Sequence, residues 1–294
     1  MNPITEIARM SARVSGGRLR SWSFRAAIPG LMILSLVAFA GLPQPMCIYY
    51  GQARNAYGEP YTKDAEVILY RGTNVVARHT ITGDLSPGVN FALYAHLDDG
   101  RSAKNYSPRA VHAGDLVSVV VSDGQGQKTI MENQAVPQVG QPGDQILINA
   151  TAGDDTDGDG LPDQWEYELI AGSDGWLNSL ADVRGSDDFD GDGQSNLAEY
   201  RAGTYAFLNY DFFYAEQFTL TPNGRFQVTF WGVPGKVYRA QCTANPTREV
   251  WIPCPLALSD TADFQAPPAV GTGNWLSLYL PLTPGARFFR LVVE

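Results

Sequence analysis

The chain has 294 residues, of which 44% are hydrophobic and 18% are charged, and its formal net charge is −10 at pH 7. The length suggests two domains plus connecting material, and the composition is ordinary for a globular protein. Its 30 glycines and 19 prolines fit a turn-rich β protein better than a helical one. The acidic balance argues against nucleic acid as a partner.

The first forty residues have the pattern of a secretory signal peptide. Five arginines precede an apolar run over residues 26–40, which ends in the small-x-small sequence Ala38-Phe39-Ala40. The run is short for a bilayer span and contains Pro29 and Gly30, although an uncleaved membrane anchor is the alternative. We therefore expect cleavage after Ala40 and a secreted, cell-surface or periplasmic protein that has no membrane contact once the signal is removed.

Residues 41–151 are expected to form an N-terminal β-sandwich. Segments rich in β-branched and aromatic residues are separated by turn sequences such as Ser-Pro-Gly and Asp-Gly, and these segments are 65–70, 74–82, 89–97 and 115–124. Several short strands with regular turn signals indicate a sandwich. The opening YYGQARNAYGEPY also resembles the first strand and turn of carboxypeptidase-regulatory-like or transthyretin-like sandwich modules, over this short stretch only.

Residues 152–206 differ in character and carry most of the acidity. The stretch 151–200 contains fourteen Asp and Glu but only one basic residue, Arg184. An evenly acidic surface would indicate only solubility, whereas such a concentration indicates cation binding. Apolar residues at helical spacing predict short helices in this segment, with Pro162 at a first helical position and Gly172 at a C-terminal stop.

Two acidic stretches match the twelve-residue calcium loop of an EF-hand. In each loop, aspartates occupy positions 1, 3 and 5, a glycine occupies position 6 and a glutamate occupies position 12. The ligands predicted for the first loop are Asp155, Asp157, Asp159, the carbonyl of Leu161, Asp163 and Glu166; those for the second are Asp188, Asp190, Asp192, Gln194, Asn196 and Glu199. Every position of the template is occupied in both stretches. The alternative interpretation, an acidic flexible linker, would not require this spacing.

The spacing has a physical reason. Ca²⁺ takes six to eight oxygen ligands at about 2.3–2.6 Å. Alternate residues of a tightly curved loop point inward, the glycine permits the sharp turn, and the glutamate on the following helix chelates with both oxygens. Without a cation, the five carboxylates of the first loop and the four of the second would repel one another. Magnesium prefers fewer protein ligands in strict octahedra, so two Ca²⁺ ions are predicted.

The stretches DTDGDGLPDQWE and DFDGDGQSNLAEYRAGT resemble the calcium-binding repeats of dockerin-like, EF-hand-like and thrombospondin type 3 segments in exported bacterial proteins. The resemblance implies calcium at these same residues. The chain departs from it in two ways. The stretch before Asp155 reads as a strand rather than an entering helix, and the loops start 33 residues apart and end in Glu, where a dockerin has closer repeats ending in Asp. These departures put docking to a cohesin in doubt.

Residues 207–294 are expected to form a C-terminal β-sandwich, with strands at 225–233, 236–242, 274–280 and 286–293. In the first strand, Phe226, Val228 and Phe230 fall on one face, with Gln227 and Thr229 on the other. The stretches VPGKVYRAQ and RFFRL resemble a small sandwich that closes many multi-domain exported bacterial proteins, a resemblance that implies no activity.

Three cysteines follow the predicted signal. Cys242 and Cys254 flank a turn-rich stretch of a predicted hairpin, so we expect a disulfide between them in an oxidising compartment. Two small buried residues are the alternative. Cys47 has no evident mate.

The sequence shows no convincing catalytic constellation. The three histidines, His79, His96 and His112, are dispersed without a zinc-binding spacing, and neither a nucleophile elbow nor a phosphate-binding glycine loop occurs. We therefore expect a non-catalytic, calcium-binding structural or adhesion-type protein, in which two ions rigidify the segment between two sandwiches.

Other functions stay open. A polysaccharide-binding protein would use exposed aromatic residues, for which Tyr49, Tyr50, Tyr57 and Tyr61 are candidates, although clustered tyrosines also serve cores and strand pairs. A dockerin-like docking module of an extracellular assembly would bind another cell-envelope protein. An unrecognised hydrolase is the third class, without a visible nucleophile–base pair.

Overall fold

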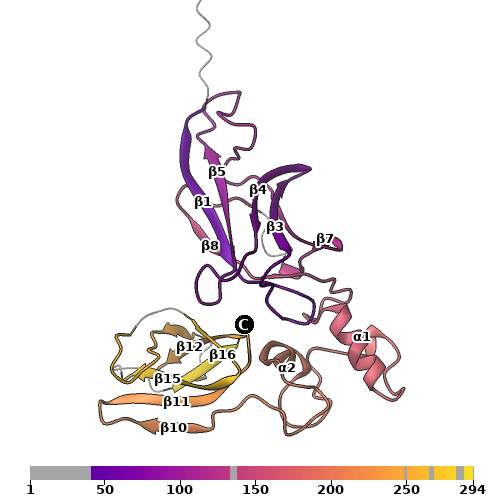
Figure 1. The fold of residues 1–294 in the computed structure, drawn as a ribbon, viewed down its shortest axis with the longest axis vertical. Coiled ribbons are helices and arrows are strands. Elements are labelled where there is room, and N and C mark those ends of the chain that lie inside the picture. Colours follow the sequence, from indigo (N-terminus) through magenta and orange to yellow (C-terminus); the bar gives the residue numbers. More distant parts are fainter. Residues whose placement is uncertain (1–40, 133–137, 248–249, 265–267, 283–287, 294) are drawn as a thin grey trace, which may run out of the picture. The chain divides into compact units, whose positions relative to one another are not determined.

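The computed structural model describes residues 41–294 apart from 133–137, 248–249, 265–267, 283–287 and 294. The fold is mainly β, as predicted, with several sheets and two α-helices among the described residues (Figure 1). The signal peptide predicted for residues 1–40 lies outside the described residues. In the described ranges, no helix is long and apolar enough to span a bilayer.

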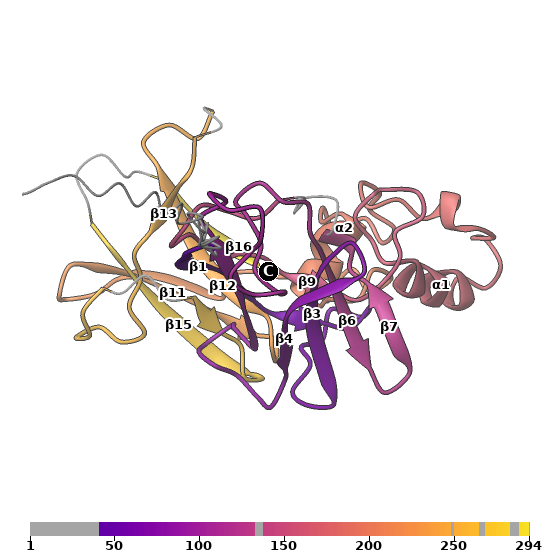
Figure 2. The same ribbon diagram turned by 90° about the horizontal axis from the view of Figure 1, so that it is seen from above.

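Residues 41–151 form three sheets. The strands are β1 (Pro43–Gly51), β2 (Ala53–Arg54), β3 (Ala65–Arg71), β4 (Asn74–Thr80), β5 (Phe91–Asp98), β6 (Ser118–Asp123), β7 (Gly126–Thr129), β8 (Gln145–Leu147) and β9 (Ala150–Thr151). One sheet has the order β4-β3-β6-β7 and is antiparallel throughout (Figure 2). The second has the order β5-β1-β8, in which β1 pairs antiparallel with β5 and parallel with β8, and β2 pairs parallel with β9.

Both larger sheets contribute side chains to one hydrophobic core. Strand β3 buries Val67 and Leu69, β6 buries Val121, and β1 and β5 bury Tyr49 and Leu93 in the same cluster. Alternate residues of a strand point to opposite faces, so the apolar alternation predicted from the sequence places these side chains inward.

Beside this core, the side chain of Asn90 is hydrogen-bonded to the backbone of Ala53 and Tyr61. Its side chain is fully buried immediately before β5. Its Oδ1 accepts a hydrogen bond from the Ala53 backbone N–H at 2.7 Å, and its Nδ2 donates to the carbonyls of Ala53 at 2.9 Å and Tyr61 at 2.8 Å. A side-chain amide can serve a donor and two acceptors in this way, so one residue satisfies three backbone groups.

Residues 152–206, the central segment, contain two α-helices and one 3₁₀ turn. The helices are α1 (Asp163–Gly172) and α2 (Asn196–Ala202), and the 3₁₀ turn is η2 (Leu180–Asp182). Pro162 occupies the N-cap of α1 rather than the predicted first helical position, and α1 ends at Gly172 as expected. Helix α2 is capped by the Ser195 hydroxyl, which accepts a hydrogen bond from the Ala198 N–H at 3.3 Å, and it ends at Gly203 in the left-handed conformation.

Residues from Gln217 onward form two further sheets. The strands are β10 (Gln217–Leu220), β11 (Arg225–Gly232), β12 (Val237–Thr243), β13 (Ile252–Cys254), β14 (Ala269–Val270), β15 (Asn274–Pro281) and β16 (Phe288–Val293). One sheet has the order β10-β11-β15, and in the other β12 pairs with β13, β14 and β16.

The two C-terminal sheets share a core of their own. Val228 and Phe230 of β11, Leu278 of β15, and Tyr238 and Ala240 of β12 belong to one buried cluster. The predicted two faces of β11 are therefore confirmed, since the phenylalanine–valine side faces this core.

All three cysteines are buried free thiols. Cys242 on β12 and Cys254 on β13 lie on paired strands, close enough that burial and the neighbouring Cys242 raise the pKa of the Cys254 thiol to about 12. The predicted bridge between them is not formed in this structure, and oxidation of the pair stays a prediction.

Candidate metal centres

The two acidic loops share one hydrogen-bonding pattern. In the first, the Asp155 carboxylate accepts hydrogen bonds from the N–H groups of Gly158 at 2.7 Å and Gly160 at 3.1 Å. In the second, the Asp188 carboxylate accepts them from Gly191 at 2.8 Å and Gly193 at 2.9 Å. The aspartate at position 1 thus folds each loop around itself by binding the N–H groups of positions 4 and 6.

The backbone conformations also repeat. The glycines at position 6 have φ of 95° for Gly160 and 97° for Gly193, in the left-handed region that side chains with a Cβ avoid. At position 9, the Asp163 N–H donates to the Asp154 carbonyl at 2.9 Å, and the Asn196 N–H donates to the Asp187 carbonyl at 2.7 Å. Two loops of different sequence have therefore closed in the same way.

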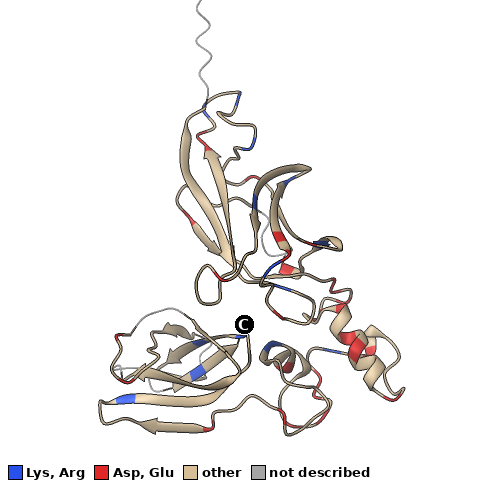
Figure 3. Cartoon of the chain, viewed as in Figure 1, with Lys and Arg blue, Asp and Glu red and all other residues tan. Residues whose placement is uncertain are grey.

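This closure gathers carboxylates. The ligand atoms of Asp155, Asp157 and Asp159 lie within 4.8 Å of one another, and those of Asp188, Asp190 and Asp192 do the same. Figure 3 shows acidic residues gathered on α1 and on the loops of the central segment. Each triad brings up to three negative charges into a space of the size that one cation occupies.

The glutamates at position 12 provide a second, independent feature. Glu166 of α1 and Glu199 of α2 are fully buried. Both carboxylate oxygens of each lack a hydrogen-bond partner. Buried charged groups are almost always paired or bound to a metal, because an unpaired one costs several kcal/mol or more.

The second acidic loop contains further buried oxygens that lack a hydrogen-bond partner. Asp190 Oδ2, Asp192 Oδ2 and Asn196 Oδ1 are also buried without a partner, in addition to the two oxygens of Glu199. Five unpartnered oxygens from one loop and its helix match the hard-oxygen ligand set that calcium prefers.

Burial and neighbouring negative charges raise the pKa values of Glu166 and Glu199. Burial first, and then repulsion from Asp157 and Asp159, raises the pKa of Glu166 to about 8. Burial first, and then Asp190 and Asp192, raises the pKa of Glu199 to about 8. A cation among the aspartates would reverse the second cause, since it favours the ionised carboxylates.

Positions 7 and 9 are placed differently in the two loops. Leu161 buries its side chain in the core of the central segment, so only its carbonyl is left as the predicted ligand. Gln194 Nε2 donates to the Phe213 carbonyl at 3.2 Å. Asp163 directs both oxygens to Thr156, at 2.7 Å to the N–H and 2.5 Å to the hydroxyl, so it braces the first loop. Asn196 Nδ2 donates to the Arg184 carbonyl at 2.9 Å.

The loops are joined by a connection that the sequence did not reveal. The Gly185 N–H donates to Asp159 Oδ2 of the first loop, and the Gly185 carbonyl accepts from Leu197 of α2 at 3.0 Å. Asp211, downstream of α2, is a second unpredicted contributor, because its charge adds to the repulsion on Glu199. No spacing rule indicates either residue; only the fold brings them near.

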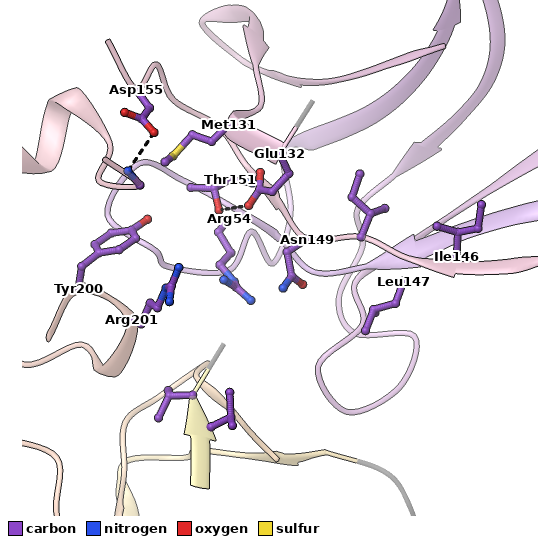
Figure 4. Close-up of a pocket in the computed structure, with 14 residues that line it drawn as sticks. Arg54, Met131, Glu132, Ile146, Leu147, Asn149, Thr151, Asp155, Tyr200 and Arg201 are labelled. Carbon is purple, nitrogen blue, oxygen red and sulfur yellow. Dashed lines mark hydrogen bonds between the residues drawn. The ribbon is translucent and has the colours of Figure 1, made fainter. Parts of the chain in front are cut away.

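A hollow of about 640 Å³ borders the first loop at Asp155 and Gly160 (Figure 4). The Glu132 carboxylate at its wall accepts hydrogen bonds from the Thr151 N–H and hydroxyl, both at 2.8 Å. Burial raises the pKa of Glu132. Tyr200 of α2 also lines the hollow, which therefore borders the first loop and α2 but no residue of the second loop.

The raised glutamate pKa values predict how calcium-free protein responds to pH. Because the folded pKa of about 8 exceeds the ordinary value of 4.5, folded protein binds more protons between these values. Its free energy of unfolding in chelator should therefore fall as the pH rises from about 4.5 to about 8. Urea unfolding at several pH values in EGTA measures this.

The double variant Glu166→Gln/Glu199→Gln is the control, because it lacks both titrating groups. Burial lowers the pKa of His79, which contributes the opposite slope up to about pH 6.5. Subtracting the variant's profile from that of the wild type removes this contribution. If the free energy of unfolding depended on pH in the same way in both proteins, Glu166 and Glu199 would not be the groups with raised pKa values.

Comparison of the chain with protein-family models, with curated proteins and with solved structures found no match to any of them.

Proposed function

We propose that the central segment binds two Ca²⁺ ions, one in each acidic loop, and that the protein is an exported, non-catalytic structural or adhesion-type protein. The observation that carries the calcium sites is the pair of fully buried, unpartnered glutamates, Glu166 and Glu199, each beside a triad of aspartates. An acidic linker would leave such carboxylates in water.

The chemistry of the donors favours calcium over other ions. All predicted ligands are oxygens, which excludes the cysteine- and histidine-rich sets that zinc prefers. Each loop offers three aspartates and a glutamate with both oxygens free. Such a set suits six to eight ligands, whereas Mg²⁺ keeps several waters in a strict octahedron.

A structural role follows from the size of the central core. The buried apolar residues of this cluster are few, namely Leu161, Leu169, Leu177, Val183, Tyr200 and Ala206. A segment with so little buried apolar surface needs another source of stability, and metal ions commonly supply it in small units. The ions would therefore hold α1 and α2 in place rather than act on a substrate.

The flanking regions fit a structural role as well. We infer that residues 41–151 and 207–294 are each two-layer β-sandwiches, because a pair of sheets in each region contributes side chains to one core. The resemblance of the loops to EF-hand-like repeats of exported proteins, and the signal pattern of residues 1–40, support a location outside the cytoplasm, where calcium is near 1 mM and loops with Kd of about 10⁻⁴–10⁻³ M are filled.

Isothermal titration of the metal-stripped protein with CaCl₂ tests the proposal. We expect two bound ions per chain with Kd of about 10⁻³ M or tighter. Titration with MgCl₂ should give much weaker binding. The matched control is Glu168→Gln, which removes an exposed carboxylate from the same helix as Glu166 and should leave both sites intact. Absence of calcium binding in the wild type would refute the proposal.

A further inference from the structure

Two tryptophans lie exposed on the sheet β10-β11-β15. Trp231 of β11 and Trp275 of β15 are cross-strand partners, and their ring centroids are 5.7 Å apart at an interplanar angle of 87°. They are 47% and 55% exposed, although tryptophan is highly buried on average. Both point away from the C-terminal core, which takes the alternate residues Phe230 and Leu276 of the same strands. An exposed aromatic pair on a rigid sheet indicates a contact surface.

A row of uncharged polar groups continues from the tryptophans along the same face. Thr229 Oγ1 and Ser277 Oγ are cross-strand neighbours hydrogen-bonded at 2.8 Å. Gln227 Nε2 donates to both of them, at 3.3 Å and 3.2 Å. Their mutual hydrogen bonds fix these side chains, so the row is organised in advance of any ligand. From Gln227 to Trp231 the strand extends about 13 Å, longer than a single pyranose ring.

The outward positions of these three strands carry one charged side chain, Arg225. Its guanidinium donates to the carbonyls of Ala262 at 2.6 Å and Ser259 at 3.3 Å, and it lies 4.3 Å from the centre of the Phe264 ring. It is therefore occupied at the far end of the row. Single-stranded nucleic acid, which also stacks on aromatic rings, requires a groove of positive charge that this face does not provide.

We infer that this face binds a neutral polysaccharide. A sugar ring presents a face of C–H groups, which packs on an indole, and an edge of hydroxyls, which exchanges hydrogen bonds with hydroxyl and amide groups. The face offers both in one line, from Trp231 and Trp275 to Thr229, Ser277 and Gln227. A second copy of the chain fits less well, because the core of a self-association interface is largely apolar. Here the two indoles and the half-buried Tyr279 share the face with a row of polar side chains.

This surface differs from the tyrosine cluster that the sequence suggested for the same class of ligand. Tyr49 is fully buried and donates its hydroxyl to the Gln138 carbonyl at 2.9 Å, and Tyr61 is half-buried with its hydroxyl 3.3 Å from Asp123. Tyr57 is exposed, but its neighbours in the cluster are not. The tryptophan face needs no calcium ligand and is independent of the proposed metal sites.

Affinity gel electrophoresis of the full chain tests the inference. Gels would contain xylan, mannan, hydroxyethylcellulose, laminarin or amylose, with anionic alginate for comparison. We expect retardation by at least one neutral polysaccharide. Trp231→Ala and Trp275→Ala should each weaken it at least about tenfold, because truncating a buried contact tryptophan commonly costs that much. Gln227→Ala should weaken it less.

The matched control is Phe218→Ala. It removes an aromatic side chain of the same sheet that is 56% exposed but stacks on Phe226 at the opposite face. Retardation should be unchanged there and in Glu166→Gln/Glu199→Gln, which separates this inference from the calcium sites. No retardation on any neutral polysaccharide, or equal retardation of the tryptophan variants, would overturn it. So would a wild-type dimer that Trp231→Ala converts to monomer, or binding of an oligothymidylate through the same residues.

Discussion

Replacing both Glu166 and Glu199 with glutamine should remove the stabilisation by calcium while making the calcium-free protein more stable. The wild type buries two unpartnered carboxylates beside aspartate triads, and a bound cation would offset the repulsion among these charges. Glutamine has nearly the same shape, carries no charge and can donate to the aspartates. At a hundredfold excess of ion over Kd, each site contributes about 2.7 kcal/mol to the wild type, and the double variant should lose nearly all of it.

The measurement is thermal unfolding in 10 mM CaCl₂ and in EGTA. Tryptophan fluorescence includes a signal from the central segment, because Trp165 packs on Tyr200 and Trp176 packs on Phe189, with ring centroids 5.6 Å and 5.0 Å apart. The midpoint of the wild type should rise by about 10–20 °C with calcium, since two sites at about 2.7 kcal/mol each act together and about 1 kcal/mol corresponds to 2–4 °C at this size. Glu168→Gln should behave like the wild type. A double variant that gains as much from calcium as the wild type would disprove the ligand roles.

Asn90→Ala should destabilise the N-terminal region by about 2–5 kcal/mol. The substitution leaves the Ala53 N–H and the Tyr61 carbonyl without the partner that the Asn90 amide provides at 2.7 Å and 2.8 Å. The Ala53 carbonyl keeps the hydrogen bond that it accepts from the Tyr61 N–H at 3.0 Å. Each buried group that loses its only partner costs about 1–3 kcal/mol. Asn90→Asp should be at least as damaging, because it removes both donors and buries a charge.

The exposed Asn74 at the β3–β4 turn provides the control, and Asn74→Ala should change stability by less than about 0.5 kcal/mol. Unfolding should be followed by circular dichroism, because residues 41–151 contain no tryptophan. Calcium should be present throughout, so that the central segment stays folded. A loss below about 1 kcal/mol for Asn90→Ala would show that the Ala53 N–H and the Tyr61 carbonyl find other partners.

Short-range features were predictable from the sequence because they depend on neighbouring residues. The two loops share one backbone arrangement, in which Asp155 and Asp188 bind the N–H groups of the same two loop positions. The two faces of β11 follow directly from alternation. Helix α1 begins one residue later than predicted, with Pro162 as its cap, and such boundaries are set by fine differences in local geometry.

Long-range features could not be predicted in this way. Nothing in the local pattern shows that β1 pairs with β8 in parallel, or that Tyr49 is buried while Tyr57, eight residues on, is exposed. The role of Asn90 depends on contacts 29 and 37 residues away. The tryptophan face arises from the pairing of β11 with β15, which places Trp231 opposite Trp275. Pairing partners are fixed by the whole chain, and a single strand does not encode them.

Through the hydrogen bond from Gly185 to Asp159, the proposed first ion would also stabilise a part of the backbone that it does not contact. An ion that fixes the Asp159 carboxylate also fixes the backbone just ahead of the second loop, where Gly185 in turn holds Leu197 of α2. With the first ion bound, hydrogen bonds at Gly185 would hold the middle of the stretch from Val183 to Asp187 in place. This stretch should then be a poor substrate for proteases. Stripping that ion would loosen both loops together, so the segment should be lost as a unit rather than site by site.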